Sequence, residues 1–76
     1  MNEIPFLCFT THDDPEYRAI GVRARYLDEA VMCLVERPEL VGYHVRRAVE
    51  VGEEEMRAVR HVFSAPSGLA GSGFLE

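Results

Sequence analysis

Residues 4–10 restrict the fold of this chain more than any other segment. They read Ile-Pro-Phe-Leu-Cys-Phe-Thr, with apolar side chains at consecutive positions rather than at every second one. Because neighbouring side chains of a strand point to opposite faces of a sheet, this run predicts a central strand covered on both sides. The 76 residues suffice for one domain. Its core is modest, since a chain of this size buries only about 60–65% of its unfolded surface.

The next segment, residues 17–25, fits two structures. Residues 22–25 alternate between apolar and basic side chains, which is a strand pattern. A helical stripe also runs from this segment into the residues that follow, and Asp14 and Pro15 would suit the start of a helix. We favour the strand because Gly21 would weaken the interior of a helix.

The remaining patterns complete an α+β fold of order β-β-α-β-α. Periodicity and terminal charges predict helices at residues 27–37 and 53–63. Between them, alternating side chains predict a strand at residues 40–51. Arg47 is the one basic side chain on the valine-rich face of that strand. A right-handed crossover would place the third strand beside the first and parallel to the second. We therefore predict a small domain over residues 1–63, with a three-stranded sheet of order 2-1-3, and a Gly/Ser/Ala-rich tail over residues 64–76.

The first predicted helix contains an uninterrupted apolar run over residues 30–35. A helix that is apolar around most of its girth requires burial on more than one side. Either the second helix or a second copy of the chain would supply that cover, so both arrangements stay open.

One face of the predicted sheet is the main candidate for binding a protein partner. The first strand would present an apolar pair at its centre, either Phe6 with Cys8 or Leu7 with Phe9. Basic side chains of the edge strands would flank this pair, namely Arg23, Arg25, His44 and Arg46. The competing interpretation is that the second helix or the tail covers this face and that the arginines pair with Glu53, Glu54 and Glu55. An apolar strip between arginines is also suited to stacking on single-stranded nucleic acid.

The chain is acidic, with a formal net charge of −5. This charge argues against nonspecific binding to nucleic acid or to anionic membranes. The acidic residues form two clusters, Asp13-Asp14 and Glu53-Glu54-Glu55. Turn chemistry and a favourable helix start explain such clusters, and the functional alternative is an acidic surface for an arginine-rich partner.

The sequence offers little for catalysis. It shows neither a phosphate-binding glycine loop nor metal ligands at a suitable spacing, so we expect no cofactor, no metal and no enzymatic activity. Cys8 and Cys33 lie in apolar runs, which favours buried free thiols over a disulfide. The acidic N-terminus and the lack of a long apolar run predict a cytoplasmic protein that does not span a membrane.

In its overall profile the chain resembles small phage-encoded inhibitors of the anti-CRISPR kind. The resemblance lies in size, acidity, a single compact domain and the lack of a catalytic constellation, and it assigns no residue a role. It implies a stoichiometric blocker of a larger host machine such as a nucleoprotein complex. The first expectation is thus a protein-binding inhibitor or adaptor. The alternatives are a single-stranded nucleic-acid-binding module and a small homodimeric regulatory or antitoxin-like protein.

Overall fold

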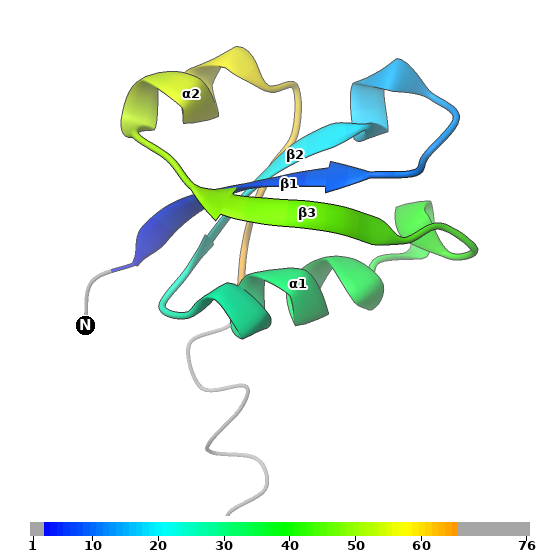
Figure 1. Cartoon of the computed structure of the whole chain (residues 1–76), viewed down its shortest axis with the longest axis horizontal. Helices are drawn as coiled ribbons and strands as arrows, with labels where there is room; N and C mark the ends of the chain where they lie inside the picture. Colours follow the sequence, from blue (N-terminus) through cyan, green and yellow to red (C-terminus); the bar gives the residue numbers. More distant parts are fainter. Residues whose placement is uncertain (1–2, 66–76) are drawn as a thin grey trace, which may run out of the picture.

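The computed structural model describes residues 3–65, which form one sheet with two helices packed on it (Figure 1). The sheet has four strands in the order β3-β1-β2-β4. The elements are β1 (Ile4–Thr10), η1 (Pro15–Tyr17), β2 (Ala19–Ala24), α1 (Leu27–Val35), η2 (Pro38–Leu40), β3 (Val45–Glu50), α2 (Glu53–Ala58) and β4 (Val62–Ser64), where η marks a 3-10 turn. The α+β class and the order of the first three strands are confirmed, but the prediction of only three strands is wrong.

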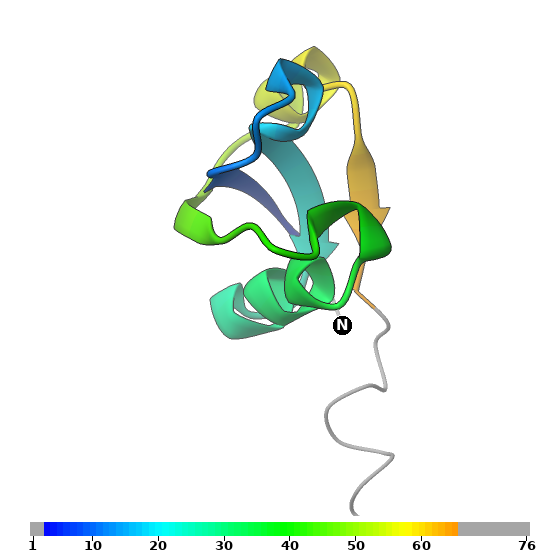
Figure 2. The same ribbon diagram turned by 90° about the vertical axis from the view of Figure 1, so that its right-hand side faces the viewer.

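Strand β1 lies between β2 and β3, as its two apolar faces predict. It pairs antiparallel with both neighbours, and its side chains alternate between the two sides of the sheet. Phe6 and Cys8 are buried in the core with Leu34 of α1, whereas Leu7 and Phe9 are half-buried on the other side. The two helices lie on opposite sides of the sheet, with α1 on the side of Phe6 (Figures 1 and 2).

Residues 19–24 form strand β2, as favoured over the helix, and α2 packs closely on its glycine. A Cβ atom on Gly21 would lie 2.9 Å from both Sδ and Cε of Met56, and 3.2 Å from Cγ2 of Val59. Met56 is buried, although it belongs to a helix of only six residues. The missing side chain of Gly21 therefore lets α2 approach the sheet.

The prediction of a helix over residues 53–63 is correct only for its first half. Helix α2 ends at Ala58, and the chain then extends into β4, which pairs parallel with β2. The Gly21 amide donates to the His61 carbonyl and the Ala65 amide to the Arg23 carbonyl, each at 2.9 Å. These long-range backbone hydrogen bonds outweigh the local helical pattern, because helix propensity is a weak preference that tertiary context overrides.

Strand β3 is shorter than predicted and contains a β-bulge. Residues 38–40 form the turn η2, and the strand begins only at Val45. Phe9 pairs with Arg47, but Thr10 pairs with Val45, so Arg46 is the extra residue of the bulge. The predicted alternation therefore holds only on the C-terminal side of Arg46.

The folded part of the chain reaches beyond the predicted domain boundary at residue 63. Ser64 ends β4, and the side chain of Ala65 is buried in the core. The rest of the predicted tail, residues 66–76, lies outside the described residues. Within residues 3–65, neither helix has the length and apolar character needed to cross a membrane.

Candidate functional site

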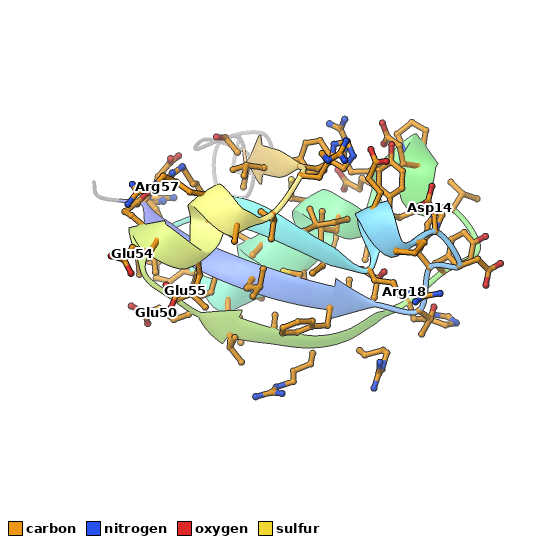
Figure 3. The ribbon with its side chains drawn as sticks, turned by 90° about the horizontal axis from the view of Figure 1, so that it is seen from above. Asp14, Arg18, Glu50, Glu54, Glu55 and Arg57 are labelled. Carbon is orange, nitrogen blue, oxygen red and sulfur yellow. The ribbon has the colours of Figure 1, made fainter. Side chains whose placement is uncertain are left out.

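Helix α2 covers only part of its side of the sheet. It packs over Gly21, which pairs with Leu7, whereas Phe9 pairs with Ala19 and Arg47 nearer the other end of β1. Figure 3 views this side: Glu54 and Glu55 of α2 lie at one end, and Arg18 lies at the other. The glutamates of α2 therefore lie where the helix covers the sheet, with Arg57 beside them, and Arg18 and Asp14 lie at the other end.

Phe9 and Arg47 form the centre of the part that α2 leaves open. The guanidinium carbon of Arg47 lies 5.8 Å from the centroid of the Phe9 ring. Paired residues of neighbouring strands share a face, so Val49 also lies on this side because it pairs with Leu7. Arg46 and Arg47 are both exposed. We call this set, Phe9, Arg46, Arg47 and Val49, the Phe9–Arg47 surface.

A polar hollow adjoins this surface at the end of β1. Its volume is about 480 Å³, and its lining includes Thr11, His12, Arg18 and Arg46. The Arg18 side chain donates to the backbone carbonyls of His12, at 3.0 Å, and Asp13, at 2.8 Å. Arg18 is thus held in the turn that follows β1, beside the exposed arginines of β3.

The structure separates the residues predicted to form the partner-binding face. Phe6 is only 5% exposed and belongs to the core, so the apolar pair on the open side is Leu7 with Phe9. His44 precedes β3, and its amide donates to Oγ1 of Thr11 at 2.9 Å. Arg46 occupies the bulge, so Arg47 rather than Arg46 pairs with Phe9. The predicted flank of His44 and Arg46 is therefore corrected to Arg46 and Arg47.

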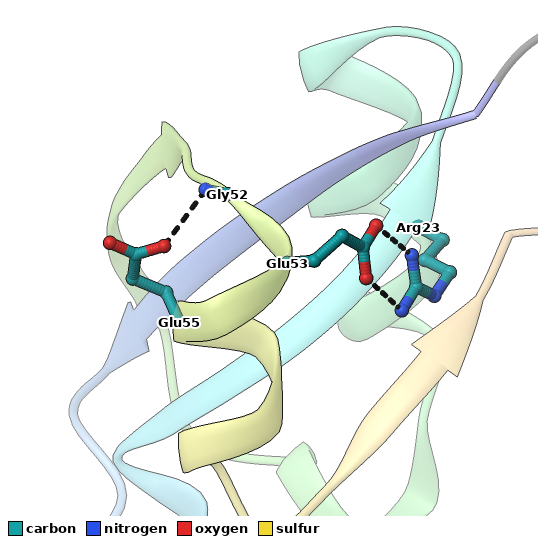
Figure 4. A network of polar contacts seen from close by, with 4 residues as sticks. All are labelled: Arg23, Gly52, Glu53 and Glu55. Carbon is teal, nitrogen blue, oxygen red and sulfur yellow. Dashed lines mark hydrogen bonds and ion pairs between the residues drawn. The ribbon is translucent and has the colours of Figure 1, made fainter.

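The other predicted flank, Arg23 and Arg25, forms ion pairs with glutamates, as the competing interpretation holds for arginines of this face. Arg23 donates to both carboxylate oxygens of Glu53, at 2.7 and 2.8 Å (Figure 4). This hydrogen bond raises the pKa of Arg23 and lowers the pKa of Glu53. Arg25 lies 3.7 Å from Glu29 of α1 and 5.6 Å from the ring centroid of Tyr26. Both arginines are thus held by their own chain.

Local roles also account for most of the two acidic clusters. Asp14 accepts a hydrogen bond from the Glu16 amide at 3.0 Å and so caps η1. Asp13 accepts from the Tyr43 hydroxyl at 3.4 Å. Glu55 reaches back and accepts a hydrogen bond from the Gly52 amide at 3.0 Å, which satisfies one backbone donor at the start of α2 (Figure 4). Glu54 is exposed and points away from the sheet at the acidic end (Figure 3).

A stack of aromatic and histidine rings joins three separate loops and was not predicted. His12 stacks on Tyr43 with 4.0 Å between centroids, and Tyr17 stacks on His61 at 4.6 Å. His12 and Tyr17 are 5.0 Å apart, which connects the two pairs. Nε2 of His61 also lies 2.7 Å from Oε2 of Glu16. Only the position of β4 brings His61 here, so no local sequence signal could have placed it.

Both cysteines are free and buried. Burial raises the pKa of the Cys8 thiol to about 11, and the neighbouring Cys33 acts in the same direction. Burial likewise raises the pKa of Cys33, against the opposing effect of Arg37. A protonated thiol is a poor nucleophile and a poor metal ligand. Among residues 3–65, no three His, Cys, Asp or Glu side chains are grouped so that they could hold a metal ion.

The raised pKa of Cys8 predicts that stability falls in alkaline solution. Between about pH 9 and pH 11 the unfolded chain loses this thiol proton while the folded chain keeps it, so the unfolded state binds fewer protons. The free energy of unfolding should therefore fall by about 2–3 kcal/mol across this range. Urea unfolding over a pH series measures the fall. Cys8→Ala, used as the control, should show a clearly smaller slope, and equal slopes would contradict the prediction.

No family model matches the chain, and neither a curated protein nor a solved structure matches it significantly. The function is therefore argued from the chemistry of the described residues. An aromatic ring beside a guanidinium group offers apolar contact and charge-assisted hydrogen bonds in one place.

Proposed function

We propose that this protein is a non-catalytic binding protein that engages a protein partner through the Phe9–Arg47 surface. The observation that carries the proposal is the position of Arg47, 5.8 Å over the Phe9 ring on the part of the sheet that α2 leaves open. Aromatic and arginine side chains are enriched at the centres of protein interfaces, where they supply most of the binding energy. In this role the protein acts as an inhibitor or adaptor.

Charge indicates the kind of segment that the surface would accept. Arg46, Arg47 and Arg18 lie at one end of the sheet face, opposite the glutamates of α2. A partner segment with an apolar side chain over Phe9 and carboxylates beside these arginines would complement both parts of the surface. The resemblance to phage-encoded inhibitors implies a subunit of a host nucleoprotein complex as the source of such a segment.

Two features support a non-catalytic role, and a third supports a cytoplasmic location. The thiols, the strongest nucleophiles that the sequence offers, are buried with raised pKa values. Nε2 of His61 lies 2.7 Å from Oε2 of Glu16, and the His61 ring stacks on Tyr17, so this nitrogen and this ring face are engaged within the chain. Free cysteines are typical of reducing compartments such as the cytoplasm.

A charge-reversal experiment tests the surface. The double variant Arg46→Glu, Arg47→Glu is expected to lose partner capture, with a Kd raised at least about a hundredfold, because repulsion replaces two charge-assisted contacts. The control is Arg57→Glu, Arg60→Glu, which changes the net charge equally at exposed positions in and after α2. Affinity capture from the native host, read by mass spectrometry, compares the three proteins.

Proteins captured by the wild type and the control, but not by the Arg46/Arg47 variant, are the partners that use this surface. Equal capture by all three proteins would refute the proposed surface. Circular dichroism of each variant should show an unchanged fold, because both arginines of β3 are exposed.

Single-stranded nucleic acid is the second candidate ligand, because the same surface combines an aromatic ring with Arg18, Arg46 and Arg47. Bases stack on exposed aromatic rings, and arginines neutralise phosphates. This alternative predicts binding of a labelled oligonucleotide that weakens steeply as salt rises. Absence of binding at low salt would exclude it and leave the protein partner.

A further inference from the structure

The polar hollow at the end of β1 contains two arginines that pair with no carboxylate of residues 3–65. Arg18 donates to the backbone carbonyls of His12 and Asp13, which carry no charge that could neutralise it. Arg46, the extra residue of the β3 bulge, is exposed and makes no hydrogen bond or ion pair within the described part of the chain. Three other arginines do pair with glutamates, namely Arg23, Arg25 and Arg37. The hollow therefore leaves positive charge for a ligand.

The guanidinium group of Arg18 is held in place before any ligand binds. Its Nε and Nη2 atoms donate to carbonyls in the turn after β1, at 3.0 and 2.8 Å, and Figure 3 shows Arg18 at this end of the sheet face. Because arginine has five N–H donors, these two contacts leave Nη1 and one N–H of Nη2 for a ligand. A side chain that is already ordered loses less rotamer entropy when a ligand binds.

Thr11 adds a donor from another segment of the chain. Its Oγ1 accepts from the His44 amide at 2.9 Å, and its hydroxyl hydrogen can still rotate toward the hollow that it lines. The Thr10 hydroxyl, by contrast, donates to a backbone carbonyl at 2.7 Å, and both ring nitrogens of His12 lie within hydrogen-bonding distance of backbone groups. The side chains of the lining that can donate to a ligand are therefore Arg18, Arg46 and Thr11.

Asp13 is the acidic side chain in the lining of the hollow. Its Oδ2 accepts from the Tyr43 hydroxyl at 3.4 Å, which is a long hydrogen bond. Two arginines and one aspartate give the lining a net positive charge, although the chain as a whole carries −5. Because the aspartate would repel a bound anion, its removal should strengthen binding, whereas removal of an arginine should weaken it.

The size of the hollow and the arrangement of its donors indicate the class of ligand. Its volume of about 480 Å³ lies within the range of about 300–1,000 Å³ that is usual for small-molecule sites. A phosphate monoester carries a charge of about −1.5 to −2 at pH 7 and has three terminal oxygens. Arginine donors match such oxygens well. Donor side chains on three segments therefore suit a phosphate group better than a carboxylate, which has only two oxygens.

We propose that this hollow binds the phosphate monoester group of a small molecule, with Arg18, Arg46 and Thr11 donating to its oxygens. The site goes beyond the proposed function: it shares Arg46 with the Phe9–Arg47 surface, but it needs no protein partner. Because Arg46 and Asp13 are exposed, water screens the charges. We therefore expect a dissociation constant of about 1–10 mM for a ligand that contacts the protein through its phosphate group alone.

Amide NMR of the isotopically labelled full chain, at neutral pH and constant ionic strength, tests the site. Glycerol 3-phosphate is expected to shift the amide signals of Thr11, Arg18 and Arg46 along one saturating curve. Glycerol, which lacks the charged group, should leave these signals unchanged. Malonate carries its two charges on separate carboxylates, so it should bind at least about fivefold more weakly than glycerol 3-phosphate.

Three variants assign the binding to the hollow. Arg46→Gln should weaken binding about tenfold, because a charge-assisted contact is lost. Asp13→Asn should strengthen binding about threefold, because the repulsion is removed while the amide oxygen can still accept from Tyr43. Arg57→Gln is the matched control: it removes one exposed arginine of α2 and should bind within about twofold of the wild type. All three positions are exposed, so each variant should keep the dispersed spectrum of a folded domain.

Shifts that do not saturate, or that centre on Arg57 and Arg60 instead, would overturn the hollow as a binding site. Malonate binding as tight as that of glycerol 3-phosphate would overturn the preference for a phosphate group. Equal weakening by Arg46→Gln and Arg57→Gln would overturn direct contact with Arg46, since net charge alone would then account for binding. These titrations contain no partner protein, so this proposal and the proposed function fail separately.

Discussion

Replacing Leu34 with alanine is expected to lower the free energy of unfolding by about 2–5 kcal/mol. Leu34 is fully buried, and it packs in the core with Phe6, Ile20 and Cys8. The lost contacts and the cavity left behind both contribute to this cost. A core this small supplies only about 3–5 kcal/mol of net stability, so the variant should lose a large part of it. Urea unfolding followed by circular dichroism measures the change.

Met32→Ala is the control for this prediction. Met32 lies in the same helix but is 48% exposed, so its truncation should change the stability by less than about 1 kcal/mol. Similar losses in both variants would show that burial of Leu34 does not set the cost.

Thr10→Val is expected to lower the free energy of unfolding by about 2 kcal/mol, although valine has nearly the same shape. Thr10 is 3% exposed, and its hydroxyl donates to the Tyr17 carbonyl at 2.7 Å. The same oxygen accepts from the His12 amide at 3.1 Å. Valine would leave both backbone groups without this partner, at the point where the chain leaves β1.

Two variants isolate the hydroxyl. Thr10→Ser keeps the oxygen, and its stability should lie closer to that of the wild type than to that of Thr10→Val. Thr11→Val removes a hydrogen bond to the His44 amide that water can replace because the site is exposed, so it should cost less than about 1 kcal/mol. Thermal unfolding of the three proteins ranks them, and a Thr10→Ser value as low as that of Thr10→Val would contradict the argument.

Elements whose signals are local were predictable from the sequence. The apolar run of residues 4–10 identified the central strand, and Gly21 decided between strand and helix for β2. Strand β4 was not predictable, because three residues carry no periodicity and their pairing with β2 is set by the whole intervening chain. The bulge at Arg46 was not predictable either, because the alternating pattern of residues 40–51 gives no sign of an extra residue. That extra residue reverses which side chains share a face.

The candidate surface was predicted in part for the same reason. Phe9 was identified as a candidate from the apolar run, and the structure places it on the open side. Arg47 could have been identified as well: it was the one basic residue on a valine-rich face, and such an exception indicates that part of the face is not covered. For Arg23 the sequence left two interpretations open, a partner-binding face or pairing with Glu53–Glu55. The packing of α2 on β2 brings Glu53 to Arg23 and so decides for the pairing.

The parallel pairing of β4 with β2 has a consequence for the order in which the domain assembles. The β1–β2 hairpin closes a short loop, whereas β4 can pair only after the chain has returned across α1, β3 and α2. Contacts between residues far apart in sequence form late, because loop closure costs entropy before any contact offsets it. A late strand of three residues is also the first to detach in the native state. Its detachment would break the hydrogen bond from the Gly21 amide to the His61 carbonyl, separate His61 from Tyr17 and expose the edge of β2.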